Sequence, residues 1–449
     1  MTYVETIDYL YSLERFGIRL GLENISNILN LLDNPHRKFE TIHIAGTNGK
    51  GSTAAMTASI LQHAGYKTGL YTSPHLQDFM ERIMINGVMI PENDVVELTK
   101  KIRSKLKGQG SWVRGQEKDK LAPCPLPLNP TFFEFTTAMA FLYFAEEMVD
   151  FAVVEVGMGG RLDATNVLNP VLSIITEIDI EHTEHLGGDI RTIAMEKGGI
   201  IKEKGTVILS SCKREAIEAI EAVCKEKHAR LYRIERDFGI RISECGMSNT
   251  IFEFRNPQSA IPNLKIPLRG KYQPINASTA VMAAHILAEK GFTIGESAIR
   301  EGLKNVRWNG RFEVVSEEPL IILDGAHNPA AAKMLADELK AIKGQSQEEE
   351  SKLILIIGIL KDKDFRGIIS SLAHLADYVI IVRPKSDRTR EPGDLKNEFL
   401  KYISDAEVIE DIPDAISKAK HIAGKDDIIC ITGSFFTIGE ARNIIKGKI

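Results

Sequence analysis

Residues 41–53, TIHIAGTNGKGST, have the composition of a loop that binds phosphate groups. An apolar stretch leads into a glycine-rich turn, and the run STAAMTASILQHAG that follows has the character of a helix. The backbone N–H groups of such a turn, together with the N-terminus of the helix, favour phosphate oxygens. Lys50 would add a positive charge at the terminal phosphates. The alternative is a strand-to-helix turn that uses glycine only for its geometry.

The spelling of this loop departs from the common phosphate-binding pattern. In G-x-x-x-x-G-K-[ST], a hydroxyl residue directly follows the lysine and reaches Mg²⁺. Here Gly46 stands three residues before Gly49, and Gly51 occupies the position of the hydroxyl. Either the match is degenerate or other residues hold the metal.

Two further segments place polar residues at the ends of expected strands. Ser73 and His75 follow one strand, where open α/β sheets bind ligands, although Ser-Pro-His also suits the start of a helix. Glu155 closes the apolar run FAVVE, ahead of the glycine-rich GMGGRLDATN with its Arg161 and Asp163. A carboxylate beside a phosphate loop is suited to bind Mg²⁺, directly or through water. The alternative is an acid that caps a sharp turn.

Residues 179–197 carry an unusual density of ionisable side chains, which core packing does not explain. These are Asp179, Glu181, His182, Glu184, His185, Asp189 and Lys197. Zinc would need a cysteine or a third neutral ligand at a fixed spacing, and none is present. A Mg²⁺ site assisted by one imidazole stays open, although histidine is not the preferred ligand of Mg²⁺. Lys197 lies on an expected helix and could equally be a surface charge.

The second half of the chain repeats this arrangement at its own strand ends. Asp324 and His327 end one strand in LDGAHNPAA, and Ser434 ends the last strand before a helix. Arg311 precedes these strands in WNGRFE, at the expected domain boundary. No phosphate loop occurs in this half, so we expect it to complete the site of the first half across a cleft.

Short apolar runs alternate with longer amphipathic segments, which predicts an α/β protein with mostly parallel sheets. The first set of strands is expected at 41–46, 151–157, 171–178 and 205–210, and the second at 320–326, 352–360, 377–384 and 426–434. A helix is expected within residues 268–291, and residues 235–268 look rich in strands. We expect domains at 1–305 and 306–449, the second smaller and Rossmann-like.

Composition excludes several classes of protein. The 449 residues carry a net charge of −5, without a basic cluster interleaved with aromatic residues, so nucleic acid is not an expected partner. No window is apolar enough to span a membrane, and the first residues lack the basic start and apolar run of a signal peptide. The five cysteines are scattered without metal-site spacing, which favours a reducing cytoplasm.

Residues 104–130, SKLKGQGSWVRGQEKDKLAPCPLPLNP, stand apart because they are polar, rich in glycine and proline, and without periodicity. A loop of this length inside a compact domain is usually functional or disordered. Either a mobile flap or a plain linker fits this composition, and we favour the flap.

Taken together, these segments resemble the folylpolyglutamate synthase/dihydrofolate synthase family, within the ATP-dependent Mur ligase superfamily. The similarity rests on ordered motifs across nearly the whole chain, namely RFGIRLGLENISNIL, HIAGTNGKGST, TSPHL, FFEFTTAMAF, EVGMGGRLDATN, EHTEHLG, EKGGIIK, YQPINA, WNGRFE and LDGAHNP. In this family the loop is spelled G-T-N-G-K-G-[ST], so a glycine at position 51 is expected. The 104–130 segment is longer and more polar than the family's usual approach to TFFE, which puts substrate preference there in doubt.

The resemblance implies a two-step reaction that uses ATP and Mg²⁺. A substrate carboxylate attacks the γ-phosphate of ATP, and the amine of L-glutamate attacks the resulting acyl phosphate to form an amide. The two anionic reactants repel each other, so cations must screen them and hold them in line. The acceptor would be a folate, dihydropteroate or both, which the sequence does not decide.

The family's functional residues can be carried over position by position. The phosphates of ATP would lie on Gly46, Thr47, Asn48, Gly49, Lys50, Gly51 and Ser52. Further ATP contacts are implied for Asn276, Arg311 and Asp324, and Mg²⁺ ligands for Ser73, Glu155 and His182. Lys50, Lys197 and His182 would act in catalysis, and Lys197 matches a lysine that is carbamylated by CO₂ in this family.

Weaker assignments concern the two other substrates. Arg82, Phe132, Phe133 and Glu134 are expected to line the pterin side. His327 and Ser434 are candidates for the incoming glutamate. A monomer is expected, since both halves of the site lie in one chain.

Two other enzyme classes and one non-enzyme class are alternatives to this hypothesis. UDP-muramoyl amino-acid ligases usually carry a nucleotide-sugar-binding domain before the phosphate loop, and the 45 residues before Gly46 leave no room for one. A P-loop small-molecule kinase would not need the second α/β domain, and its loop should carry a hydroxyl after Lys50. A nucleotide-dependent switch or partner-binding ATPase would hydrolyse ATP slowly without substrate.

Overall fold

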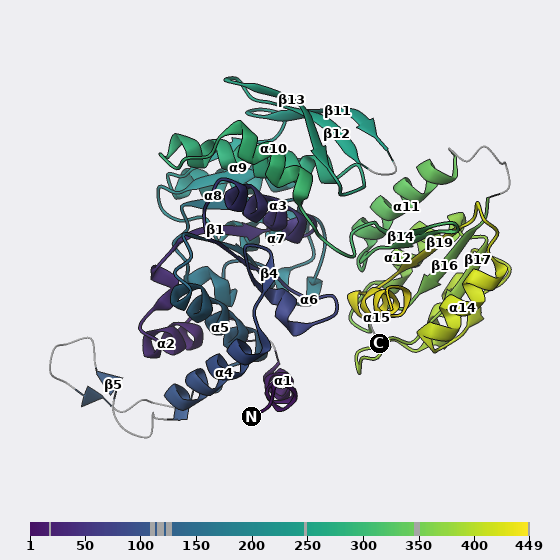
Figure 1. Cartoon of the computed structure of the whole chain (residues 1–449), viewed down its shortest axis with the longest axis horizontal. Coiled ribbons are helices and arrows are strands. Elements are labelled where there is room, and N and C mark those ends of the chain that lie inside the picture. The colour runs from purple at the N-terminus through teal and green to yellow at the C-terminus, as the bar shows by residue number, and fades with distance from the viewer. Residues whose placement is uncertain are drawn as a thin grey trace.

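The computed structural model describes residues 1–17, 19–107, 113–114, 121–122, 128–246, 249–344 and 351–447. Two α/β domains follow each other along the chain, the larger built around β1 and the smaller around β16 (Figure 1). The predicted fold class is confirmed.

The large domain is built on one sheet with the strand order β10-β9-β8-β1-β7-β2-β3-β4 among the described residues. Its strands are β1 (Glu40–Ala45), β2 (Thr68–Tyr71), β3 (Ile83–Ile85), β4 (Val88–Met89), β7 (Phe151–Glu155), β8 (Leu172–Ile175), β9 (Thr206–Leu209) and β10 (Arg230–Arg233). The strands from β10 to β2 run parallel, and only β3 and β4 pair antiparallel at the edge. The carboxyl ends of the parallel strands therefore meet at one edge.

Helices cover both faces of this sheet, which is why β7 and β8 at its centre are buried at every position. They are α1 (Tyr3–Ser12), α2 (Glu23–Leu31), α3 (Lys50–His63), α4 (Glu92–Lys107), α5 (Phe132–Glu146), α6 (Thr183–Leu186), α7 (Ile190–Gly198), α8 (Arg214–Glu226), α9 (Gln273–Glu289) and α10 (Glu296–Asn305). Alternate side chains of a strand point to opposite faces. On β7, Val153 accordingly joins the core under α3, α9 and α10, whereas Val154 joins the core under α5.

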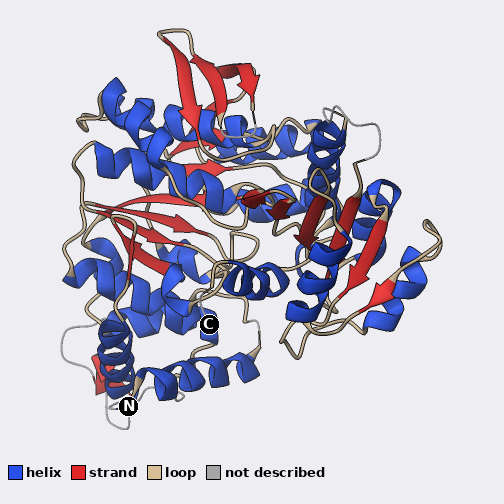
Figure 2. Cartoon of the chain, turned by 45° about the vertical axis from the view of Figure 1, so that its right-hand side comes forward, coloured by secondary structure: helices blue, strands red, loops and turns tan. Residues whose placement is uncertain are grey.

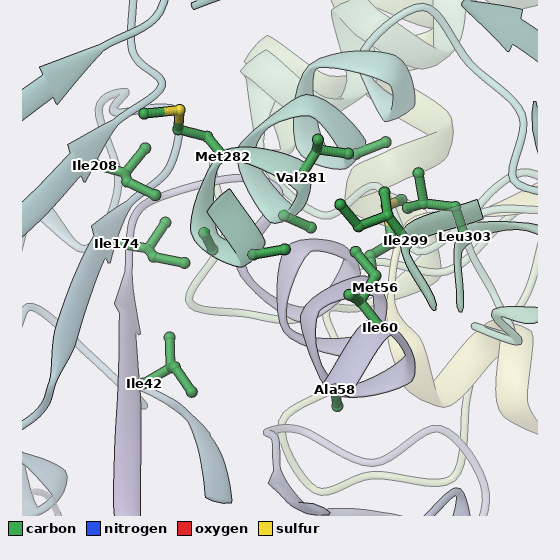
Figure 3. Packing of buried hydrophobic residues seen from close by; sticks show 14 of the residues in the cluster. Ile42, Met56, Ala58, Ile60, Ile174, Ile208, Val281, Met282, Ile299 and Leu303 are labelled. Carbon is green, nitrogen blue, oxygen red and sulfur yellow. The ribbon is translucent and has the colours of Figure 1, made fainter. Parts of the chain in front are cut away.

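The core under α3, α9 and α10 places the phosphate-loop helix against the sheet. Ile42, Ile174 and Ile208 of the sheet point toward the helices in Figure 3, and Met282 of α9 lies next to Ile208. Other labelled side chains of this core come from α3, α9 and α10, namely Met56, Ala58, Ile60, Val281, Ile299 and Leu303. Helix α3 is thus buried on several sides, and the loop before it has a fixed position relative to the sheet.

The region predicted to be rich in strands forms a separate antiparallel sheet of β11 (Gly239–Cys245), β12 (Thr250–Arg255) and β13 (Ala260–Ile266). It projects from the large domain next to α9 and α10 (Figure 1 and, from another side, Figure 2). Phe252, Phe254 and Leu264 on its inner face extend the core of that domain.

The small domain has its own sheet with the order β14-β15-β19-β16-β17-β18 among the described residues. Its strands are β14 (Glu313–Glu317), β15 (Leu320–Leu323), β16 (Leu353–Ile357), β17 (Tyr378–Ile381), β18 (Glu407–Val408) and β19 (Ile428–Thr432). Its helices are α11 (Pro329–Lys343), α12 (Phe365–Leu372), α13 (Pro392–Phe399), α14 (Ile412–Ile422) and α15 (Phe435–Ile445). Only β14 pairs antiparallel, so the other strands again share one carboxyl edge.

All eight predicted strands are present, each shorter at one or both ends than its predicted range. The prediction of an irregular segment from residue 104 is wrong at its start, because residues 104–107 form the last turn of α4. Within the rest, β5 (Val113–Arg114) pairs antiparallel with β6 (Leu121–Ala122). Residues 108–112, 115–120 and 123–127 lie outside the described part, so the flap stays a prediction.

The connection between the domains runs from the end of α10 to the start of β14 at Glu313. The division near residue 305 is compatible with these elements and stays our proposal. Over the described ranges, no helix is long and apolar enough to cross a membrane.

The contact between α3 and α10 gives a test of this packing. A Cβ on Gly302 would lie 2.5 Å from the Cα of Ile60. Alanine normally stabilises a helix by about 1 kcal/mol relative to glycine, whereas an extra methyl group in a packed core costs about 1–3 kcal/mol. We therefore expect Gly302→Ala to lower the free energy of unfolding in urea titrations. Ser297→Ala at an exposed position of α10 is the control, and stabilisation by Gly302→Ala would contradict the close packing.

Candidate functional site

A cavity of about 770 Å³ lies between the two domains and collects the predicted site residues. Its lining includes the whole loop from Gly46 to Ser52, the three candidate metal ligands, the three candidate ATP contacts and all six candidate substrate residues. Lys197 is the one predicted residue that does not line the cavity. The sequence-based expectation that the two sheets face a common cleft is consistent with this arrangement.

The turn between β1 and α3 needs glycine at two positions. Gly46 has φ +149° and Gly49 has φ +87°, conformations that other residues rarely adopt. Added Cβ atoms would also collide, at 1.9 Å from the Thr176 hydroxyl and at 2.4 Å from the Asn276 side chain. The loop is therefore closely packed on both sides, and it leads directly into the N-terminus of α3.

The end of β8 holds the loop from behind. The backbone N–H of Thr47 donates to the carbonyl of Glu177 at 2.7 Å, and the Thr47 hydroxyl donates to the carbonyl of Asp179 at 3.0 Å. The Thr47 side chain is thus occupied within the protein. Its contribution to a phosphate site would come from the backbone.

Gly51 owes its identity to the connection between the domains. A Cβ at this position would lie 2.8 Å from Cζ2 of Trp308, which precedes β14. The hydroxyl of the common phosphate-loop pattern therefore has no space here. Sequence reasoning included Trp308 in a motif but assigned it no role.

Lys50 forms no salt bridge with a carboxylate among the described residues, although its charge acts on Glu155 and Glu181. Its Nζ donates to the carbonyls of Gly46 and Thr47 at 2.8 and 3.0 Å. Neutral carbonyls hold the ammonium group in place without cancelling its charge. It therefore stays available to an anion in the cavity.

Lys197 lies behind the loop, and its interpretation as a surface charge is wrong. The side chain is 1% exposed, and its Nζ is 2.5 Å from Oε1 of Glu181 and 2.8 Å from the carbonyl of Gly46. Burial lowers the pKa of Lys197 to about 8, although Glu181 favours the charged form. The same ion pair overcomes the desolvation of Glu181 and lowers the pKa of its carboxyl group to about 2.

Glu155, Ser73 and His182 approach the cavity from three strand ends. The Glu155 carboxylate is buried and accepts a hydrogen bond from the backbone N–H of Ser73 at 3.2 Å. Burial raises the pKa of Glu155, and the charge of Lys50 opposes that shift. His182 is open to the cleft but desolvated by the surrounding chain, which lowers its pKa to about 4. Its imidazole is therefore neutral at pH 7 and able to bind a metal.

This donor set fits Mg²⁺ that is shared with a nucleotide. In the described part of the chain, no group of three or more His, Cys, Asp or Glu side chains is suited to hold a metal. Mg²⁺ in nucleotide sites usually keeps one or two carboxylates and completes its shell with phosphate oxygens and water. One carboxylate, one hydroxyl and one imidazole beside a phosphate loop agree with that pattern.

The small domain contributes Arg311 and Asp324. The Arg311 guanidinium lies 4.6 Å from the ring centre of Phe435. Asp324 is buried, and its two oxygens accept hydrogen bonds from the backbone N–H groups of Phe312 and Ala326 at 2.8 and 2.9 Å. Asp324 thus fixes the turn next to Arg311, a role that the sequence did not suggest.

His327 and Ser434 differ in whether their polar atoms are available to a ligand. Nδ1 of His327 lies 2.8 Å from the carbonyl of Gly325 and donates to it, which leaves Nε2 as an acceptor. Burial lowers the pKa of His327 to about 3, so the ring is neutral. The Ser434 hydroxyl caps α15 by accepting from the backbone N–H of Thr437 at 3.1 Å. His327 is therefore the better placed of the two for a ligand.

Asn276 belongs to a chain of amides beside the loop. Its Nδ2 donates to Oε1 of Gln273 at 3.2 Å, and Nε2 of Gln273 donates to the Ser52 hydroxyl at 3.3 Å. Gln273 is fully buried at the start of α9. It was missed because the sequence shows it only as part of YQPINA.

An aromatic slot forms the far side of the cavity. Phe132 stacks on Tyr11 with ring centres 5.6 Å apart, and the Arg82 guanidinium lies 5.1 Å from the Phe132 ring centre. Nε of Arg82 donates to Nδ1 of His75 at 2.8 Å. Phe133 packs on Gly157, where an added Cβ would lie 2.4 Å from its ring. Flat apolar walls with a buried cation suit a planar, anionic ligand.

Glu134 has two different carboxylate oxygens. Oε2 accepts from the backbone N–H of Thr131 at 2.8 Å in a capping box at the start of α5. Oε1 is buried and has no hydrogen-bond partner among the residues that the structure describes. A buried acceptor without a partner is costly, so a donor group of a ligand would stabilise it.

Two further residues near the cavity stand in motifs of the sequence, but their contacts were not predicted. Nδ2 of Asn328, at the start of α11, donates to Oδ1 of Asn48 at 3.2 Å and so connects the small domain to the loop. Asp163 is buried and accepts from the backbone N–H of Met158 at 2.8 Å. Asp163 stands in the motif GMGGRLDATN and Asn328 in LDGAHNP, and neither motif by itself indicated these contacts.

The chain matches the Mur ligase middle domain over residues 44–284 and the Mur ligase glutamate ligase domain over residues 310–435. It is 33% identical over 450 residues to the dihydrofolate synthase/folylpolyglutamate synthase of Bacillus subtilis, covering 99% of each chain. Its structure is similar to that of Escherichia coli FolC in complex with DHPP and ADP, with 30% identity, TM-score 0.84 and coverage of 99% and 98%. It also resembles the bifunctional folylpolyglutamate synthase/dihydrofolate synthase of Yersinia pestis complexed with AMPPNP and Mn ion, with 28% identity, TM-score 0.83 and the same coverage.

The buried pair of Lys197 and Glu181 can be tested without substrate. Removing one partner of a buried ion pair costs about 3–5 kcal/mol, because the other charge stays buried and unpaired. We expect Lys197→Met to lower the urea midpoint of the large domain at pH 7. The double variant Lys197→Met/Glu181→Leu should recover most of that loss. Equal midpoints for the single and double variants would contradict a buried charged pair.

Proposed function

Because the chain belongs to the folylpolyglutamate synthase/dihydrofolate synthase family of Mur-type, ATP-dependent ligases, we propose that it joins L-glutamate to a folate, to dihydropteroate or to both, using ATP and Mg²⁺. One observation carries this proposal: a single cavity holds the phosphate loop, Lys50, the Arg311 side chain of the small domain and the aromatic slot. ATP and a planar acid can therefore meet in one place.

The chemistry requires two anions to approach each other. A carboxylate oxygen of the acceptor attacks the γ-phosphorus of ATP, the bond to the β-phosphate oxygen breaks, and ADP leaves. The amine of L-glutamate then attacks the acyl carbon, phosphate leaves, and the nitrogen loses a proton as the amide forms. Lys50 and Arg311 are free to screen the reacting anions because neutral groups, not carboxylates, hold them.

Ser73, Glu155 and His182 would hold the metal ion. When bound, Mg²⁺ neutralises phosphate charge and orients the phosphates for in-line transfer. Glu155 supplies the hard anionic oxygen and His182 a neutral nitrogen, while Ser73 also keeps Glu155 in place through its backbone N–H. Asn48 in the loop and Asn276 in α9 both line the cavity. They would contact ATP rather than the metal.

Lys197 is suited to the carbamylation that the family resemblance implies. CO₂ reacts with a neutral amine, and a pKa of about 8 leaves a substantial neutral fraction near pH 7.5. The product is an anion beside Glu181, so it needs a cation nearby, which Lys50 can provide. We propose that the modified side chain helps to position the metal and the acceptor carboxylate.

The aromatic slot is proposed to take the pterin ring. Phe132 and Phe133 would lie against its faces, and Oε1 of Glu134 would accept a hydrogen bond from a ring N–H group. Arg82 would face an anionic part of the acceptor. His327, with a free Nε2, is the better candidate for the incoming glutamate, and Ser434 would act mainly as a helix cap.

The domain roles follow from the same cavity. We propose that residues 1–305 bind the phosphates, the metal and the pterin, and that residues 306–449 complete the ATP and glutamate sites. A monomer would suffice, since one chain supplies both sides. The free thiols of Cys212, Cys224 and Cys430 support the proposal of a cytoplasmic enzyme.

The proposal is tested by phosphate release with ATP and L-glutamate, comparing dihydropteroate with tetrahydrofolate as acceptor. A ligase releases one phosphate for each amide formed, and only when both acceptor and glutamate are present. A small-molecule kinase would transfer phosphate without glutamate, and a partner-binding ATPase would hydrolyse ATP at the same rate without either. Another Mur-type ligase would require a different acceptor or amino acid.

Glu155→Gln is expected to raise the Mg²⁺ concentration that gives half-maximal activity. The amide keeps the size of the side chain but loses the negative charge that attracts the cation. Steady-state rates at saturating ATP, titrated with MgCl₂, measure the effect. Glu177→Gln at the neighbouring strand end is the control. Superimposable titrations of Glu155→Gln and the unmodified enzyme would remove Glu155 from the metal site.

Lys197→Ala is expected to reduce turnover severely and to recover part of it when short carboxylic acids are added. Such an acid could occupy the space of the carbamate and restore its negative charge. The activity of Lys197→Ala is measured against formate and acetate concentration. The activity of the wild-type enzyme is measured separately in CO₂-depleted buffer. If the acids do not rescue Lys197→Ala and the wild-type enzyme is fully active without CO₂, no carbamate acts at position 197.

A further inference from the structure

A hydrogen-bonded network outside the cavity joins three segments that the proposed function does not explain. They are the loop after β2, the connection between the domains and the last helix, α15. The network consists of Gln77, Arg442, Asn443, Glu313 and the backbone of Gly310, and we call it the Arg442 network.

Arg442 stands at the centre of this network. Its Nε lies 3.0 Å from both carboxylate oxygens of Glu313, and one of its terminal nitrogens donates to Oε1 of Gln77 at 2.7 Å. The side chains of Arg442 and Glu313 are only 11% and 12% exposed. A guanidinium can serve both partners at once because its donors point in fixed, divergent directions.

Gln77 completes the link to the loop that carries Ser73. Its Nε2 donates to Oδ1 of Asn443 at 2.6 Å, so both ends of the amide are bound to α15. The backbones also approach closely, since a Cβ on Gly439 would lie 2.0 Å from the carbonyl oxygen of Leu76. The loop after β2 therefore contacts the small domain without room for rearrangement.

Glu313 transmits this contact to the turn before β14. Its Oε2 accepts from the backbone N–H of Gly310 at 2.9 Å, and the Gly310 carbonyl accepts from Gly325 N–H at 2.9 Å. Phe312 N–H is held by Asp324. The backbone is thus fixed on both sides of Arg311, and Trp308, slightly upstream, packs on Gly51.

From these contacts we propose that Arg442 is a positioning residue for ligation. Acting through Glu313 and Gly310, it holds the side chain of Arg311 in the cavity and that of Trp308 against the phosphate loop. Arg442 does not touch the cavity itself. Only the predicted effect of Arg442 on the kinetics rests on the proposed function. The seating of Trp308 can be measured without any substrate.

Loss of the guanidinium need not unfold the small domain, because Lys446 also pairs with Glu313 at 2.6 Å. The Lys446 side chain is 41% exposed and reaches Glu313 from the solvent side. It can keep the carboxylate charge balanced but does not link it to Gln77. Arg442 and Lys446 therefore form a matched pair of substitutions on the same carboxylate.

The experiment uses Trp308 as its own reporter. The chain has two tryptophans, so Trp112→Phe leaves Trp308 as the single one. In that background we compare Arg442→Met, Arg442→Lys and Gln77→Leu with the control Lys446→Met. Acrylamide quenching and the emission maximum report the exposure of Trp308, and initial rates give kcat and KM for ATP. Thermal melts check that each variant is folded.

For Arg442→Met we expect stronger quenching, a red-shifted emission maximum and a fall in kcat/KM for ATP of about 10- to 100-fold, since misplacement by ~1 Å can cost about 10²-fold. Gln77→Leu should change Trp308 in the same direction. Arg442→Lys should restore the melting temperature but not kcat/KM, because an ammonium group cannot bridge both partners. Lys446→Met should leave fluorescence and kinetics unchanged.

Unchanged Trp308 fluorescence in Arg442→Met and Gln77→Leu would overturn the inference, whatever the kinetics show. If Arg442→Met fails to fold, Gln77→Leu and Arg442→Lys decide by the same two readouts. Absence of any glutamate-dependent turnover in the parent enzyme would refute the proposed function instead. The fluorescence comparison would still decide whether the Arg442 network holds the turn before β14 in place.

Discussion

The packing of the Trp308 indole on Gly51 is the contact on which the rest of the cleft depends. It leaves no space for a side chain after Lys50, so in the proposed function the Mg²⁺ ligands come from elsewhere. Hard donors are present at other strand ends, where Glu155 and Ser73 meet. The same contact fixes the connection between the domains and with it the approach of Arg311 to the cavity.

Charge is divided into two layers around this loop. In front, Lys50 and Arg311 are held by carbonyl groups and by an aromatic face, and their charges stay available to anions. Behind, Lys197 is paired with Glu181 in a buried position. Gly46 connects the layers, because its carbonyl accepts from both lysines. This separation suits a reaction in which phosphate and carboxylate must approach each other.

The sequence predicted the sheets and most of the cavity, because strand ends and glycine turns are local signals. Glu155 and Ser73 could be found since each follows an apolar run, and the parallel order of the strands brings them together. The burial of Lys197 could not be found, because its partner Glu181 lies 16 residues earlier, outside α7, and a charged position on an isolated helix looks exposed. Trp308, Gln273 and Arg442 were missed for the same reason: their contacts cross between segments. Asp324 lines the cavity, but both of its carboxylate oxygens accept hydrogen bonds from backbone N–H groups, so its predicted contact with ATP stays a prediction.

The central claim is that a carboxylate of the acceptor takes the γ-phosphoryl group before the amide forms. Isotope transfer tests it most directly: the acceptor is labelled with ¹⁸O in its reacting carboxylate, and the released phosphate is examined by ³¹P NMR. Transfer through an acyl phosphate predicts one ¹⁸O atom in each phosphate, seen as an isotope-shifted resonance. Phosphate that contains no ¹⁸O, released together with amide product, would contradict the account.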